Sequence, residues 1–276
     1  MNVKALALRH TRAAFLALAL LLGAAPAANA ASGDPWDGNW HSSFLFYGWL
    51  PGMTLDARVE LPSGVGKTES DGNIYDNLAG ALMFSGDFRK GDWGFFYDAA
   101  WVKFDDQDGH FTDIGGDHIN GNFGLKYNFK GGAVTLAGLY ALAHGPGGNT
   151  DVVFGGRYLW TKTNIKWDFT LTGQGGLIDI ADSGKIARNS HLSDFIVGLR
   201  GNWIFGDGHW YVPYYIDVGT GDSDLTTSAN LGIGYLFDWG SIAFVWRDLR
   251  YKQDDDSDVL HRLALDGPSF SIGWQF

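Results

Sequence analysis

Apolar and polar residues alternate along much of the chain. In the C-terminal segment 269–276 the even positions are aromatic or aliphatic, and the odd positions between them are small or polar. Segments 225–237 and 118–129 repeat this alternation. Successive side chains of a β-strand point to opposite faces. The pattern therefore predicts strands that have one oily face and one polar or small-residue face.

Turn-forming residues separate these runs. Gly, Asn or Asp stands where hairpin geometry favours positive φ in five short segments: 89–92, 130–132, 161–164, 206–208 and 238–240. Longer polar segments lie between them, at 61–77, 105–115, 144–150, 181–190, 219–224 and 252–258. The strands predicted by this division are 40–60, 78–88, 93–104, 117–129, 133–143, 151–160, 165–178, 191–204, 209–218, 225–237, 241–250 and 259–276.

The length of the runs and the position of tryptophan favour a membrane barrel over a soluble β-sandwich. The amphipathic runs match a tilted membrane strand of about 9–11 residues, whereas strands of globular proteins are mostly about 5–6 residues long. Tryptophan recurs close to the short turns, as in an interfacial aromatic girdle, at Trp93, Trp160, Trp167, Trp203, Trp210 and Trp239. We therefore predict an all-β fold, a closed antiparallel transmembrane β-barrel of twelve strands in meander order.

Closure of the barrel follows from hydrogen bonding in lipid. An open sheet edge would leave a row of unpaired amide and carbonyl groups, at several kcal/mol each. The first strand, near 40–49, is therefore expected to pair with the last, 259–276. Oily side chains such as Phe123, Leu231 and Ile272 are expected to face the lipid. Leu263 and Leu265 are expected to do so too, with a β-bulge at 267–268 that shifts the alternation before Phe270.

The first thirty residues have the pattern of a secretory signal peptide. A basic start is followed by an apolar run over 13–22 and by the small residues Ala28-Asn29-Ala30, the order of a cleaved leader. The apolar run is too short for a membrane helix, which needs about 20 residues. We expect residues 1–30 to be a cleaved signal peptide and residues 31–276 to be the outer-membrane β-barrel.

Composition narrows the function classes. The chain has 276 residues, no cysteine and 40 glycines, and its net charge is −11. Absence of cysteine excludes disulfides and thiolate metal sites, and the acidic balance argues against nucleic-acid binding. Acidic clusters at 105–108, 221–224 and 254–258 lack the spacing of an EF-hand and are interpreted as solvated loop charge. We predict no metal site and no cofactor.

The chain resembles a family of bacterial outer-membrane β-barrel proteins whose members are mostly uncharacterised in function. The resemblance lies in the order of these pieces: 46–52 (Phe-Tyr-Gly-Trp-Leu-Pro-Gly), 94–98, 195–200, 217–219, 223–226, 267–268 and the terminal Phe276. It implies the outer membrane of a Gram-negative bacterium, with outer-membrane lipid and lipopolysaccharide as surroundings. A terminal aromatic on an amphipathic last strand is similar to the signal read by the barrel-assembly machinery. The family implies no activity.

Ten charged residues fall on the predicted lumen face. They are Asp98, Lys126, Arg157, Lys166, Asp168, Asp194, Arg200, Asp217, Arg247 and Arg262. One interpretation is a charged constriction that sets the selectivity of a pore. The other is a lattice of salt bridges that neutralises buried charge and stiffens the wall. The mixture of signs favours the lattice, and the two are compatible in one barrel.

Three hypotheses for the function stay open. The first is a narrow, porin-like passive channel for small solutes or ions, since twelve strands lie between filled small barrels and wide porins. The second is a non-conducting structural or adhesive barrel that binds a partner through its external loops. The third, a lipid-modifying enzyme, has only weak candidates at His118 with Asn120 and at Ser190–Ser193, so we predict no enzymatic activity. Loop 61–77 either plugs the lumen or stays outside, and the oligomeric state is open.

Overall fold

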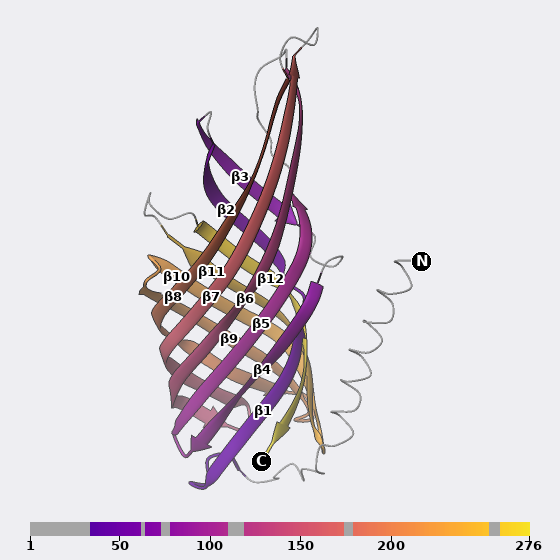
Figure 1. Ribbon diagram of the computed structural model, residues 1–276. Coiled ribbons are helices and arrows are strands. Elements are labelled where there is room, and N and C mark those ends of the chain that lie inside the picture. The colour runs from indigo at the N-terminus through magenta and orange to yellow at the C-terminus, as the bar shows by residue number, and fades with distance from the viewer. Residues whose placement is uncertain (1–33, 62–63, 73–77, 110–118, 174–178, 254–259) are drawn as a thin grey trace.

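The computed structural model describes residues 34–61, 64–72, 78–109, 119–173, 179–253 and 260–276, with side chains described for only part of the longest strands. These residues form one antiparallel sheet that closes into a barrel (Figure 1). Its strands are β1 (Trp40–Trp49), β2 (Gly52–Leu61), β3 (Gly64–Gly72), β4 (Leu78–Lys90), β5 (Trp93–Gly109), β6 (Ile119–Gly145), β7 (Gly148–Gly173), β8 (Asp179–Phe205), β9 (Trp210–Gly221), β10 (Leu225–Phe237), β11 (Gly240–Lys252) and β12 (Leu260–Gln275). The expected signal peptide, 1–30, lies outside the described residues.

The barrel wall closes between its first and last strands, as the sequence predicted. β1 pairs with β12 in an antiparallel register that runs from Ser43 opposite Gln275 to Trp49 opposite Ser269. On its other side β1 pairs with β4, and each later strand pairs with the next in chain order. Closure satisfies the backbone groups of both terminal strands, which lipid could not do.

The predicted number of wall strands was wrong: the closed wall has ten strands, β1 and β4–β12, and not twelve. Segments 130–132 and 161–164 were expected to be turns, but they lie inside β6 and β7. Lys130 pairs with Lys162 there, and the register is continuous on both sides. Two pairs of predicted strands therefore merge, and each merged pair is one long strand.

Gly132 explains why a glycine pair was mistaken for a turn. A Cβ at this position would lie 2.9 Å from the indole ring of Trp160 and 3.0 Å from the carbonyl oxygen of Ala100. Glycine is required for the close approach of a neighbouring ring and backbone, which is a known use of glycine within a strand. Composition alone does not distinguish this use from a hairpin turn.

The turn between β6 and β7 lies where a long external loop was expected. Segment 144–150 contains the tight connection Gly145–Gly148, and Gly148 has a φ of 118°. The short turns 89–92, 206–208 and 238–240 were confirmed, with positive φ at Gly91 and Gly206. The hairpin between β6 and β7 therefore lies at the short-turn end of the barrel and not at the long-loop end.

A hairpin of β2 and β3 extends the wall instead of closing the bore. The first predicted strand, 40–60, divides after Trp49 into β1 and β2. β2 pairs with β12, with Leu55 opposite Leu263, and β3 pairs with β2. The described part of the expected loop 61–77 therefore continues the sheet beside β12, as Figure 1 shows.

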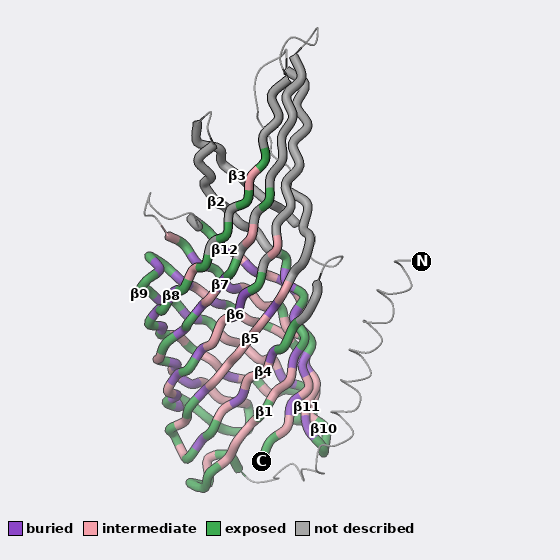
Figure 2. Tube along the Cα trace, in the orientation of Figure 1, coloured by how far each residue is buried: buried purple, intermediate pink, exposed green. Residues whose placement is uncertain are grey.

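Burial alternates along the strands, as expected for a lipid-facing outside and a filled inside (Figure 2). Leu231 is 58% exposed on β10, whereas Ser228 on the opposite parity is 6% exposed, so the outward orientation of Leu231 is confirmed. Ile272 alternates with the buried Ser271 and is partly exposed; the side chain of Phe123 is not described. No helix among the described residues is long and apolar enough to cross a membrane.

One expected change of register is absent from β12. The sequence suggested a bulge at 267–268 that would let Leu263 and Leu265 face the lipid. Pairing with β11 is continuous through Gly267 and Pro268, and the two leucines are 0% and 6% exposed. They point into the barrel, because odd positions of β12 face inward along its whole length.

The charged interior as the candidate functional site

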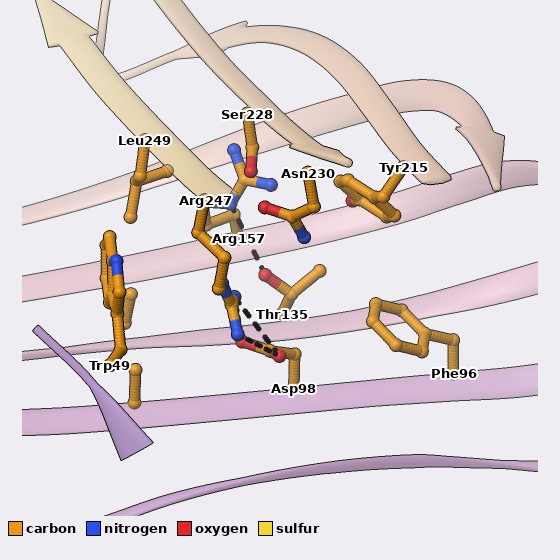
Figure 3. Close-up of a pocket in the computed structure, with 12 residues that line it drawn as sticks. Trp49, Phe96, Asp98, Thr135, Arg157, Tyr215, Ser228, Asn230, Arg247 and Leu249 are labelled. Atoms are coloured by element: carbon orange, nitrogen blue, oxygen red, sulfur yellow. Dashed lines mark hydrogen bonds and ion pairs between the residues drawn. The ribbon is translucent and has the colours of Figure 1, made fainter. Parts of the chain in front are cut away.

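The centre of the bore holds a cavity crossed by an ion pair (Figure 3). Arg247 on β11 reaches across to Asp98 on β5, with Nη2 3.2 Å from Oδ1. The Tyr47 hydroxyl donates to the same carboxylate at 3.1 Å, and the Arg247 guanidinium lies 4.4 Å from the Tyr47 ring centroid. Arg247 therefore joins β11 to β5 and packs against β1, three strands that are not neighbours in the wall.

A second pair lies beside the first and is buried more deeply. Arg157 on β7 binds Asp217 on β9 through two nitrogen–oxygen contacts, one of them at 3.0 Å between Nη1 and Oδ1. Arg157 also donates to the hydroxyls of Thr135 and Thr226, at 3.3 Å each. The exposed fractions of Arg157 and Asp217 are 4% and 3%. A buried charge pair requires this degree of hydrogen bonding to offset its desolvation.

Two further pairs occupy the bore nearer the short turns. Arg89 on β4 contacts Asp151 on β7, with Nη2 2.5 Å from Oδ2. Arg200 on β8 contacts Asp87 on β4, with Nη2 3.2 Å from Oδ2. In all, four arginines of the interior each have an aspartate partner on another strand.

An apolar layer lies on the long-loop side of these pairs. On β11 the inward residues that follow Arg247 are Leu249 and Tyr251, and on β1 Trp49 follows Tyr47. The buried cluster comprises Tyr47, Trp49, Met83, Val102, Leu159, Leu192, Leu249, Tyr251, Leu263 and Leu265. Its members come from seven wall strands, β1, β4, β5, β7, β8, β11 and β12. Polar pairs and then packed apolar side chains therefore occupy successive levels of the bore.

Asp194 has a different role from the other inward acids. Its carboxylate accepts hydrogen bonds from the Ser223 backbone amide at 2.8 Å and from the Ser223 hydroxyl at 2.9 Å. Ser223 belongs to the connection between β9 and β10. Asp194 therefore holds the adjacent loop against the rim of the barrel.

The predicted lumen residues divide into three groups. The first group lies in the interior: Asp98, Arg157 and Arg247 line the central cavity, and Asp194, Arg200 and Asp217 make the contacts described above. The structure places Lys166 and Arg262 in exposed positions. The side chains of Lys126 and Asp168 lie outside the described part of the chain.

Lys166 lies on the outer face because β7 is one strand. The sequence analysis placed Arg157 and Lys166 on separate strands, which allowed both to face inward. On an uninterrupted strand their odd separation puts them on opposite faces, and β7 pairs without a break from Asp151 to Thr172 with β8. Arg262 has the outward parity of β12, opposite to the buried Leu263.

Sequence reasoning missed three interior residues: Asp87, Arg89 and Asp151. Arg89 was assigned to a turn, and Asp151 was taken as the first residue after a loop. The alternation of faces could have identified them. Asp151 is at an odd position of β7, as Arg157 is, and Asp87 and Arg89 are at odd positions of β4, as the buried Met83 is. They were missed because the strands were assumed to end before these residues.

No group of three or more His, Cys, Asp or Glu residues that could hold a metal occurs in the described ranges. The enzyme candidate His118 lies outside them, and His191 is hydrogen-bonded through Nδ1 to the Tyr158 hydroxyl at 2.8 Å. His191 is on the outer face, opposite in parity to the buried Leu192.

No protein-family model matches the sequence, and no curated protein matches it. Among solved structures, the outer membrane protease OmpT from Escherichia coli aligns with a TM-score of 0.46 and 10% identity, over 89% of this chain and 99% of that one. The translocator domain of the autotransporter NalP from Neisseria meningitidis aligns with a TM-score of 0.34 and 16% identity, over 96% and 98%. A Pseudomonas aeruginosa FadL homologue aligns with a TM-score of 0.33 and 9% identity, over 90% and 93%.

These neighbours are outer-membrane barrels of varied roles. At such identities and TM-scores the likeness carries no argument about the activity of this chain. The class of protein defined by the coordinates themselves is a closed, ten-stranded antiparallel β-barrel with an apolar outer surface and a charged interior.

Proposed function

We propose that the protein is an integral outer-membrane barrel that does not conduct, and that it supports strands projecting beyond the membrane for binding a partner at the cell surface. The apolar outer belt supports the membrane location, because side chains such as Phe154, Phe195 and Leu231 are exposed on the outside of the wall. Such a surface is stable in lipid and unfavourable in water.

The observation that carries the proposal is the filling of the bore. Arg247–Asp98 spans the bore between β11 and β5, and Arg157–Asp217 lies beside it between β7 and β9. The apolar layer around Trp49 and Tyr251 packs beyond them. Small barrels have an interior just wide enough for side chains to fill, whereas wide channels need about 16–18 strands. A ten-stranded barrel with paired arginines and packed tyrosines inside resembles the small, filled barrels more than the wide channels.

Strand length supports the second half of the proposal. β6, β7 and β8 have 27, 26 and 27 residues, whereas about 9–11 residues suffice to span the membrane. Figure 1 shows these strands extending far past the short strands β9–β11. The residues beyond this length are not needed to span the membrane. The sheet that they form outside it is therefore available to bind a partner.

A bilayer experiment tests the closed bore. The purified protein is expected to give no conductance steps in planar bilayers. A variant that removes the crossing side chains while leaving no unpaired charge, Trp49→Ser with Asp98→Ser, Arg247→Ser and Tyr251→Ser, is expected to give discrete steps. Heat-modifiable gel migration serves as the control for folding of both proteins. Regular steps from the wild type would refute the non-conducting function.

A narrow channel is the second candidate, and one observation favours it. The central cavity is lined by Trp49 and Asn230, whose Nε1 and Oδ1 atoms are buried without a hydrogen-bond partner among the described residues. Polar groups of this kind suit a hydrated path through the bore. Conductance of the wild type that changes its ion preference when Arg247 and Asp98 are both replaced by serine would support the channel.

A further inference from the structure

Three lysines form a row across the outer face of the wall. Lys103 on β5 is opposite Lys130 on β6, and Lys130 is opposite Lys162 on β7. Directly opposed residues on neighbouring strands have their side chains on one face, about 5 Å apart at Cβ. This lysine row (Lys103, Lys130, Lys162) therefore places three cationic side chains side by side on three adjacent strands.

The row stands at the level where the outer face changes from apolar to polar. One step toward the membrane lies the row of Trp101, Gly132 and Trp160, in the same register. The Lys130 ammonium is 5.8 Å from the Trp101 ring centroid. Tryptophan rings lie at the headgroup level of a bilayer, and lysines near them extend to the polar side. The lysine row is thus at the height of lipid headgroups on the long-loop side.

Positive charge continues outward on the same strands. Lys166 on β7 is opposite Lys185 on β8, and both are exposed. Including position 126, six of the ten lysines of the chain are on β5–β8, although the protein as a whole is acidic. Among the described residues, no acidic side chain is within ion-pair distance of Lys130 or Lys162. Lys130 and Lys162 lie directly opposite each other and repel one another, so their position side by side favours an anionic ligand.

We propose that the lysine row binds the phosphorylated headgroup of an outer-leaflet lipid, with the acyl chains lying against Trp101, Trp160 and the apolar wall below. A flexible ammonium is a suitable partner for a lipid phosphate, which lies at varying depth. Each lysine near an anionic membrane surface contributes about a fivefold increase in binding. The inference rests on the proposed membrane location but not on whether the bore conducts.

The opposite wall supplies a matched control. β11 is five strands from β6 around the ten-stranded wall. It carries Arg250 and Lys252 at exposed positions near its outer end, and Arg250 is paired with Asp248 on the same face. The variants K130Q/K162Q and R250Q/K252Q therefore remove the same charge from opposite sides of one barrel.

Lipid retention tests the proposal. Each purified protein is incubated with diphosphoryl lipid A or with zwitterionic phosphatidylethanolamine, and the bound lipid is counted by native mass spectrometry. The wild type and R250Q/K252Q are expected to retain lipid A, whereas K130Q/K162Q is expected to bind it roughly 30-fold more weakly. K130R/K162R is expected to restore retention. Binding of phosphatidylethanolamine is expected to be weak and equal in all variants.

Two results would overturn the proposal. One is equal loss of lipid A in the two charge-removal variants, which would indicate a general charge effect. The other is a wild type that retains lipid A no better than phosphatidylethanolamine. Neither result bears on whether the bore conducts ions. Failure of the lipid site and failure of the proposed function are therefore distinguishable.

Discussion

The inner face of the wall and the outer face of β5–β8 carry different cations. On the inner face the cations are arginines, Arg89, Arg157, Arg200 and Arg247, and each is paired with an aspartate. On the outer face of β5–β8 the described cations at and above the aromatic level are Lys103, Lys130, Lys162, Lys166 and Lys185. One strand, β7, carries both kinds, with Arg157 inside and Lys162 outside.

The difference follows from the two side chains. The planar guanidinium of arginine binds a carboxylate through two parallel hydrogen bonds and stacks on rings, as Arg247 does against Asp98 and Tyr47. Lysine is a strongly hydrated point charge on a flexible stem, so it suits a boundary with water and mobile headgroups. The sign of a charge therefore does not distinguish a structural role from a binding role, whereas its geometry and its partner do.

The largest expected effect comes from breaking a pair inside the bore. Asp217→Ala leaves the Arg157 guanidinium buried without its carboxylate, and we expect the free energy of unfolding to fall by about 3–5 kcal/mol. Urea unfolding in lipid vesicles measures it. The outer-face pair Asp248–Arg250 is the control, since Asp248→Ala removes a partly exposed partner and should cost no more than about 1 kcal/mol. Equal losses would contradict the distinction between the faces.

A charge placed on the apolar outer belt tests the outer face itself. Leu231 lies in the middle of β10 and is 58% exposed. Leu231→Arg should destabilise the barrel by about 2–4 kcal/mol in vesicles, because the guanidinium would enter the hydrocarbon. Leu225→Arg, on the same face at the outer end of β10, should cost about 0–1 kcal/mol. The absence of this depth dependence would argue against a membrane-spanning wall.

Exchange of arginine and lysine should have unequal consequences on the two faces. Arg247→Lys keeps the charge but loses the two-nitrogen contact to Asp98 and the stacking on Tyr47, so a loss of about 1–2 kcal/mol is expected. The reverse exchange on the outer face, Lys162→Arg, should change stability by less than about 0.5 kcal/mol. Unfolding curves of the two variants, measured under the same conditions, give the answer.

The smallest effect concerns an exposed turn before β1. Hydrogen bonds from the His41 ring, and then from Asn39, lower the pKa of Asp37 from 3.8 to about 2. A depressed carboxyl pKa contributes stability above its ordinary value, and the contribution is lost as the pH falls toward about 2. His41→Ala should raise the pKa of Asp37 toward 3.8, as followed by carboxyl NMR, with little change in unfolding. An unchanged pKa would contradict the assigned cause.

The period-two pattern by itself determined the all-β class, the closed wall and the pairing of β1 with β12. It also determined which residues of 225–237 and 269–276 face outward, whereas Leu263, Leu265 and Arg262 were assigned to the wrong faces. These features depend on the alternation of side chains and on backbone hydrogen bonding in lipid, and both can be inferred from local sequence. Asp98, Arg157, Arg200, Asp217 and Arg247 were identified as interior charges for the same reason.

The number of strands, the long extension of β6–β8 and the partners of each charge depend on contacts between strands that are distant in the sequence. Segment 130–132 has the composition of a turn. Gly132 lies within β6, however, where a side chain would collide with the Trp160 ring of the next strand. The turn predicted at 161–164 is likewise absent, and without it Lys166 lies on the outer face of β7. Contacts such as Asp98 with Arg247 join residues 149 positions apart, so they depend on which strands the closed wall brings to face each other across the bore. The local alternation of side chains does not show which distant strands come into contact.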